Sequence, residues 1–159
     1  MAKVITSGFD ALIKELDDIA DHSDEICSKA LYKGAGLMAD RLKSSIDGLS
    51  TEDQRKKRSR NLLPYEKEAL QKGLSIFKFK HDKSRDYVQT SITFTGRVDH
   101  HTERYPEGLP VIVLARSINS GTTFRRANRY FPTTVRKNAQ AVEKEMADTT
   151  ERELKKFIK

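Results

Sequence analysis

The chain has 159 residues, of which 36% are hydrophobic and 33% charged, and its formal net charge is +7 at pH 7. This length predicts a single domain with a lean core. The chain contains no run of 18 apolar residues, which argues against a membrane-spanning helix, and the lone Cys27 excludes an intramolecular disulfide.

The charge is distributed unevenly along the chain. Residues 1–50 carry 6 basic and 9 acidic side chains, whereas residues 111–159 carry 11 basic and 5 acidic side chains. The excess of positive charge over residues 111–159 would favour binding to nucleic acid or to an acidic face of a neighbouring subunit. The two halves would also complement each other head to tail in a ring.

The first predicted element is a helix over about 10–47. Its apolar residues recur with a period of about 3.6 residues, Asp10 is placed to cap its start and Gly48 to end it. The polar run Ser23-Asp24-Glu25 interrupts the apolar stripe. The sequence therefore predicts either one long helix or a helix broken in two near Ser23.

Residues 50–63 are predicted to form a mobile loop, because nothing apolar lies between Ser50 and Asn61. The loop is basic, and two interpretations are open: a solvated loop, or a patch that faces DNA through its phosphates. No aromatic residue is interleaved to stack on bases. The basic side chains of this loop are Arg55, Lys56, Lys57, Arg58 and Arg60.

The middle of the chain predicts a short helix and a β-hairpin. Pro64 starts the helix and Gly73 ends it. The hairpin pairs 74–80 with 87–95, and in the second strand Val88, Thr90, Ile92 and Phe94 share one face. The segment from Gly96 to Gly108 shows no pattern and is expected to be a surface loop.

Val111 to Leu114 form a continuous apolar run, and the segment 111–118 fits either a helix or a buried strand. Pro110 and the spacing of Ile112, Ala115 and Ile118 favour the helix. A basic loop follows over 122–130, and a second long amphipathic helix is predicted from Pro132 to about 157. Together these elements predict an α+β fold: a single domain, 1–159, with two long amphipathic helices packed on a small antiparallel sheet.

Candidate chemistry is sparse. The chain has no nucleophile elbow, no phosphate-binding glycine loop and no paired-carboxylate pattern, so we expect no enzymatic activity and no cofactor. A metal site would need a second pair of ligands at zinc-like spacing, and none is present, so an ordinary polar loop is preferred. The side chains that could ligate a metal are His81, Asp82, Asp99, His100, His101 and Glu103.

Three short stretches resemble a known family. They are Gly8-Phe9-Asp10-Ala11-Leu12-Ile13-Lys14-Glu15-Leu16, Ser117-Ile118-Asn119-Ser120-Gly121-Thr122-Thr123 and Tyr130-Phe131-Pro132. The arrangement resembles the family named after gene product ten of the lambdoid phage HK-ninety-seven. Its members are tail-completion or neck components of long-tailed phages and prophages.

The resemblance implies a structural virion protein without enzymatic activity that assembles into a ring at the head–tail junction. The implied partners are further copies of the chain, head-closure (stopper) proteins, and tail-terminator or tail-tube proteins, with possible non-specific contact to packaged DNA. The implied location is the neck or tail of the virion, and the host cytoplasm during assembly. The candidate subunit interface comprises Asn119, Gly121, Thr122, Arg125, Arg126 and Arg129, and we expect charge reversal at Arg125 and Arg126 to leave the subunit folded.

Two other function classes stay open. The runner-up is a stand-alone basic nucleic-acid-binding protein, which a steep salt dependence of DNA binding by a monomer would favour. The third is a small metal-dependent nuclease, which rests only on the histidine cluster and would require cleavage that is lost on changing His100.

Overall fold

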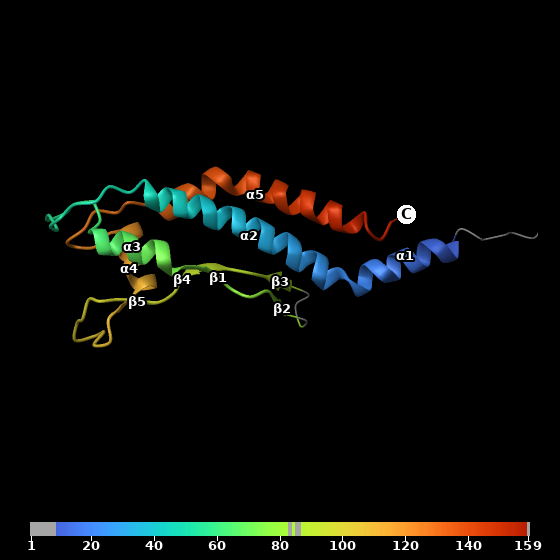
Figure 1. The fold of residues 1–159 in the computed structure, drawn as a ribbon, viewed down its shortest axis with the longest axis horizontal. Helices are drawn as coiled ribbons and strands as arrows, with labels where there is room; N and C mark the ends of the chain where they lie inside the picture. The colour runs from blue at the N-terminus through green and yellow to red at the C-terminus, as the bar shows by residue number, and fades with distance from the viewer. Residues whose placement is uncertain (1–8, 83, 85–86, 159) are drawn as a thin grey trace, which may run out of the picture.

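A computed structural model describes residues 9–82, 84 and 87–158. Gly8, the first residue of the N-terminal stretch that carries the family resemblance, lies outside the described residues. The fold is α+β, as the sequence predicts: two long helices pack together, and short antiparallel strands and two shorter helices lie beside them (Figure 1). None of the described helices is both long enough and apolar enough to cross a membrane.

The first predicted helix is broken in two, and the break lies at His22. Helix α1 covers Phe9–Asp21 and helix α2 covers Ser23–Asp47. The His22 ring packs against Phe157 with 4.8 Å between the ring centroids, which ties the junction to the C-terminal part of the chain. Asp10 was expected to cap the helix, but the helix already includes Phe9, so Asp10 lies in the first turn.

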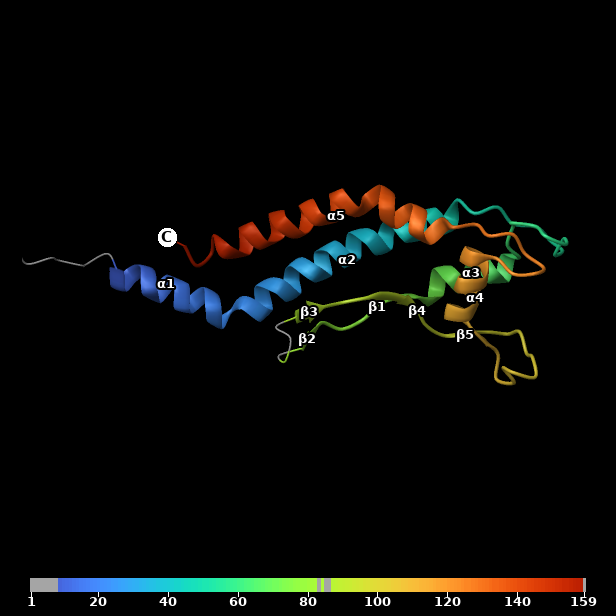
Figure 2. The same ribbon diagram turned by 180° about the vertical axis from the view of Figure 1, so that it is seen from behind.

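The second long helix, α5, covers Tyr130–Leu154 and lies along α2. It starts before Pro132, which is tolerated because the first N–H groups of a helix have no intrahelical partner. The contact with α2 is close at Gly34, where an added Cβ would lie 2.5 Å from Cγ of Met146. Figures 1 and 2 show α5 on the side of α2 away from the hairpin, so the layers run α5, α2, hairpin.

The predicted hairpin is present, but each of its strands is interrupted. Strand β1, Leu74–Ile76, pairs with β4, Ile92–Phe94, and β2, Lys80–Asp82, pairs with β3, Tyr87–Gln89. Between the two ladders, residues 77–79 lie opposite residues 90–91. This extra residue is a bulge that shifts the register by one, so one predicted sheet becomes two two-stranded ladders.

The segment from Gly96 to Gly108 was predicted to be a surface loop, and this prediction is wrong for Arg97 and Val98. Strand β5, Arg97–Val98, pairs with β6, Leu109–Pro110, in a third antiparallel ladder. The segment left open between helix and strand is helical: α4 covers Val111–Ser120. Helix α3 covers Pro64–Gly73, as predicted.

The hydrophobic core lies at one end of the molecule, where α3, α4, β4 and β5 meet the C-terminal end of α2. Its side chains are large and well buried, and Ile46, Leu62, Leu70 and Ile118 are fully enclosed. In the N-terminal half of α2 most buried residues are small: Ala30, Gly34 and Ala35, beside Ile26. We call the end of the molecule that holds this core the thick end, and the end at the N-terminal half of α2 the thin end. The candidate site lies on the thick end. The rest of the core cluster is Phe94, Val98, Val111, Leu114, Ala115 and Tyr130.

Candidate functional site at the basic end of the molecule

Two basic loops that the sequence treats separately form one surface in the structure. Segments 58–60 and 124–126 lie side by side: the Arg58 amide donates to the Phe124 carbonyl at 2.8 Å, and the Arg126 amide donates to the Ser59 carbonyl at 3.1 Å. We call the surface that they form the basic end. Its exposed cationic residues are Arg55, Lys56, Lys57, Arg58, Arg60, Arg126 and Arg129.

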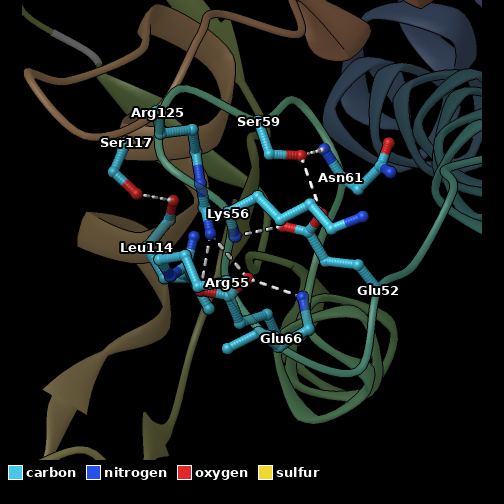
Figure 3. Close-up of polar contacts among 10 residues, drawn as sticks. Glu52, Arg55, Lys56, Ser59, Asn61, Glu66, Leu114, Ser117 and Arg125 are labelled. Carbon is cyan, nitrogen blue, oxygen red and sulfur yellow. Dashed lines mark hydrogen bonds and ion pairs between the residues drawn. The ribbon is translucent and has the colours of Figure 1, made fainter.

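A buried ion pair holds this surface on the core. Arg125 is 5% exposed and Glu66 is 3% exposed. Nη2 of Arg125 donates to both carboxylate oxygens of Glu66, at 2.6 and 2.7 Å, and Arg55 donates to the same carboxylate (Figure 3). The carboxylate also accepts the Leu63 amide at 2.9 Å, which fastens the first turn of α3. One carboxylate thus connects α3 to both basic loops.

The burial of Arg125 corrects one sequence expectation. Arg125 was assigned to the surface that meets a second subunit, and its charge was expected to be reversible without unfolding the chain. In the structure its side chain lies inside the subunit, against Glu66. A carboxylate at position 125 would face a buried carboxylate, so charge reversal there would disrupt the subunit itself. Arg126 and Arg129 are exposed and remain candidates for a contact surface.

Polar contacts anchor the loop over 50–63, which was expected to lack an anchor. Leu62 exchanges backbone hydrogen bonds with the opposite limb of the loop: the Glu52 amide donates to the Leu62 carbonyl at 2.8 Å, and the Leu62 amide to the Ser50 carbonyl at 2.9 Å. Ser59 Oγ donates to Glu52 Oε2 at 3.0 Å. The Leu62 side chain is fully buried. The basic residues are thus presented on a closed loop.

The turn at Gly121 has a structural requirement for glycine. Its φ of +79° is a conformation that L side chains rarely adopt, and an added Cβ would lie 2.8 Å from the Ala127 amide nitrogen. Thr122, next to it, is exposed and exchanges backbone hydrogen bonds with Arg125. Asn119 is half-buried, so among the candidate interface residues it has less surface to offer than Thr122.

An open, mostly polar cavity of about 860 Å³ lies across the basic end. Within the described part of the chain, no carboxylate forms an ion pair with the four exposed arginines that line it: Arg58, Arg60, Arg126 and Arg129. Arg58 and Arg129 both have left-handed backbone, with φ of 59° and 54°. Four unneutralised guanidinium groups in one cavity favour an anionic partner.

A second, mainly apolar cavity of about 330 Å³ adjoins the first, and the two share Thr122 and Arg125. Val98, Leu109 and Leu114 contribute to its lining. Two aromatic side chains at its edge are solvent-exposed: Phe124 at 70% and Tyr65 at 43%. The thick end thus offers an apolar pocket next to a cationic surface.

The residues considered for a metal do not form a ligand cluster. Among the described residues there is no group of three or more His, Cys, Asp or Glu side chains that would hold a metal ion. His101 Nδ1 lies 2.6 Å from the Pro106 carbonyl and Nε2 lies 2.7 Å from Asp99 Oδ1. These two acceptors, the Pro106 carbonyl first, raise the pKa of His101, because the charged ring donates to both.

Sequence reasoning missed Glu66, Tyr65 and Phe124. Glu66 was detectable in principle, since it stands three residues after Leu63, the position from which a carboxylate reaches back to the start of a helix. Its pairing with Arg125 joins distant parts of the chain, and no local pattern encodes such a contact. Comparison of the chain with family models, with curated proteins and with solved structures found no match.

Proposed function

We propose that this protein is a non-enzymatic structural component of a long-tailed phage or prophage, a tail-completion or neck protein that assembles with further copies of itself at the head–tail junction. The observation that carries the proposal is the basic end. Two loops carry exposed arginines that form no ion pair with a carboxylate of the described residues. Backbone hydrogen bonds and a buried ion pair hold these loops in place, on the segment expected to contact a neighbour.

The construction of this surface supports a role in assembly. A contact surface binds more tightly when its side chains need little reordering, and the Arg125–Glu66 pair fixes the loop beneath the exposed Arg126 and Arg129. Arginine is well suited to pairing with carboxylates at interfaces. The proposed partners are other copies of the chain and the head-closure, tail-terminator or tail-tube proteins.

The test is the double charge reversal Arg126→Glu with Arg129→Glu in the phage or prophage that carries the gene. Both side chains are exposed, so the subunit should stay folded while heads and tails accumulate unjoined or with aberrant tails. Lys144→Glu, an exposed reversal on α5, is the matched control and should leave particle yield unchanged. Normal particles from the double variant would show that this surface does not take part in assembly. Infectious particles after deletion of the gene would refute the proposed function.

The second candidate function is nucleic-acid binding, which the cavity with four unpaired arginines favours. Phosphate contacts of this kind would be independent of base sequence and weaken steeply with salt. Fluorescence anisotropy with a labelled DNA duplex would measure this. Binding by the monomer that is lost in the Arg126→Glu, Arg129→Glu variant would support the second function over the first.

A further inference from the structure

Helix α1 carries an apolar stripe that its own subunit leaves uncovered. Phe9 is 64% exposed, Leu12 49%, Ile13 48% and Leu16 57%. In both views α1 extends past the end of α5 and past the hairpin, with no other element alongside it (Figures 1 and 2). An amphipathic helix in water is stabilised mainly by packing of its apolar face, so this stripe needs a partner.

The partner surface of matching character is at the opposite end of the molecule. Helix α1 has five acidic residues and one basic residue. The basic end has four arginines without an ion pair in the part of the chain that the structure describes, and beside them an apolar pocket lined by the exposed Phe124 and Tyr65. An α1–α1 contact would instead bring two acidic helices together, which like-charge repulsion disfavours.

The helix cannot reach the basic end of its own subunit. Helix α2 has 25 residues and α1 has 13, so at 1.5 Å per residue they are about 37 Å and about 20 Å long. The basic end lies beyond the C-terminal end of α2, while α1 is joined to its N-terminal end at His22. Even if α1 folded back along α2, it would cover only about half of the length of α2.

We propose that α1 of one copy docks on the basic end of a second copy, with its apolar stripe over the pocket beside Phe124 and its acidic residues against Arg58, Arg60, Arg126 and Arg129. This inference rests on the proposed self-assembly and names the two surfaces that carry it. Each subunit then offers one α1 and accepts another. Contacts between two different surfaces continue from copy to copy until the ring closes.

Paired variants test this directly, with the oligomeric state measured by sedimentation velocity. The α1 variant is Leu12→Ser with Leu16→Ser, and the basic-end variant is Phe124→Ser with Arg126→Glu. All four side chains are exposed in the subunit, so both variants should keep the wild-type circular dichroism spectrum. The wild-type chain should form a closed assembly, and each variant alone should be monomeric, because each buried leucine is worth about tenfold or more in affinity. Lys144→Glu should assemble as wild type does.

Mixing the two variants gives the sharper result. One retains an intact basic end and the other an intact α1, so an equimolar mixture should form a two-subunit complex and nothing larger. The pairing is overturned if the mixture stays monomeric, if the α1 variant assembles like wild type, or if the wild-type chain is itself monomeric.

Cross-linking distinguishes this inference from the broader function. With Cys27→Ser as background, Leu12→Cys with Phe124→Cys should give a disulfide-linked ladder on oxidation, and Leu12→Cys with Arg152→Cys, an exposed site on α5, should not. Assemblies that form without the Leu12–Phe124 cross-link would reject the docking and leave the structural role standing. If the basic end binds duplex DNA and the basic-end variant, which keeps an intact α1, does not compete for it, the surface binds nucleic acid and the docking of α1 is rejected.

Discussion

Replacing Arg125 with methionine is the most direct test of how the basic end is held together. The change keeps an unbranched but shorter side chain and leaves the Glu66 carboxylate, 3% exposed, without two of its hydrogen bonds and with only the partly exposed Arg55 as a counter-charge. Removing one partner of a buried ion pair typically costs about 3–5 kcal/mol. A domain of this size loses about 2–4 °C of melting temperature per kcal/mol, so the Tm should fall by about 6–20 °C.

The assay is urea unfolding followed by circular dichroism, with Arg126→Met as the matched control. Arg126 is the exposed neighbour on the same loop, and its replacement should change stability by less than about 0.5 kcal/mol. The double variant Arg125→Met with Glu66→Gln should be less destabilised than the sum of its single changes, because no buried carboxylate then lacks its Arg125 partner. Arg55 also loses its contact with Glu66, but its side chain is 34% exposed and stays solvated. A loss of less than about 1 kcal/mol in Arg125→Met would refute the buried-pair reasoning.

Three further predictions follow from other parts of the fold. Gly36→Ala should raise the free energy of unfolding by about 0.5–1 kcal/mol, since alanine favours the helix and the added Cβ meets nothing within 4 Å; an unchanged or lower Tm contradicts this. Hydrogen bonds from Lys156, and to a smaller extent from Lys29, lower the pKa of Glu153 from 4.5 to about 2. The stability that the ionised Glu153 contributes to the fold is therefore complete above pH 4.5 and is lost as the pH falls towards 2. Glu153→Gln should make the free energy of unfolding less dependent on pH in that window, and an unaltered dependence would show the pairing to be unimportant. In hydrogen exchange, the amides of Glu52 and Arg58 should be protected relative to Lys57, because they donate to the Leu62 and Phe124 carbonyls; uniformly fast exchange over 50–63 would restore the expectation of a mobile loop.

The helices were predictable because their periodic stripes are long. The pattern placed α2 and α5 within a few residues of their ends, and the polar run at Ser23 located the break in the first helix. Short strands offer no such signal. Arg97–Val98 is a two-residue strand, and the bulge opposite residues 90–91 depends on how two chain segments pair.

The sequence predicted the basic residues of the candidate site, but it did not predict how the two loops are joined and held on the core. Both basic loops are visible in the sequence, but their union depends on the contact between Ser59 and Arg125 across distant parts of the chain. Arginine is usually exposed, which is why Arg125 was assigned to a subunit contact and its pairing with Glu66 was not foreseen. The apolar stripe of α1 was read correctly as one face of a helix, but periodicity gives no information on whether that face is covered.

The off-centre core has a consequence for how the molecule opens. Leu, Ile, Phe and Val side chains supply most of the burial at the thick end. The N-terminal half of α2 instead buries two alanines and a glycine beside Ile26, and alanine and glycine remove little apolar area from water. Cooperative stability should therefore be graded along α2 and α5, with partial opening at the thin end at a free energy below that of global unfolding. The core holds the thick end of the subunit rigid, whereas the thin end, which carries α1, bends at a small cost in free energy. Helix α1 can therefore align with neighbouring subunits at slightly different angles.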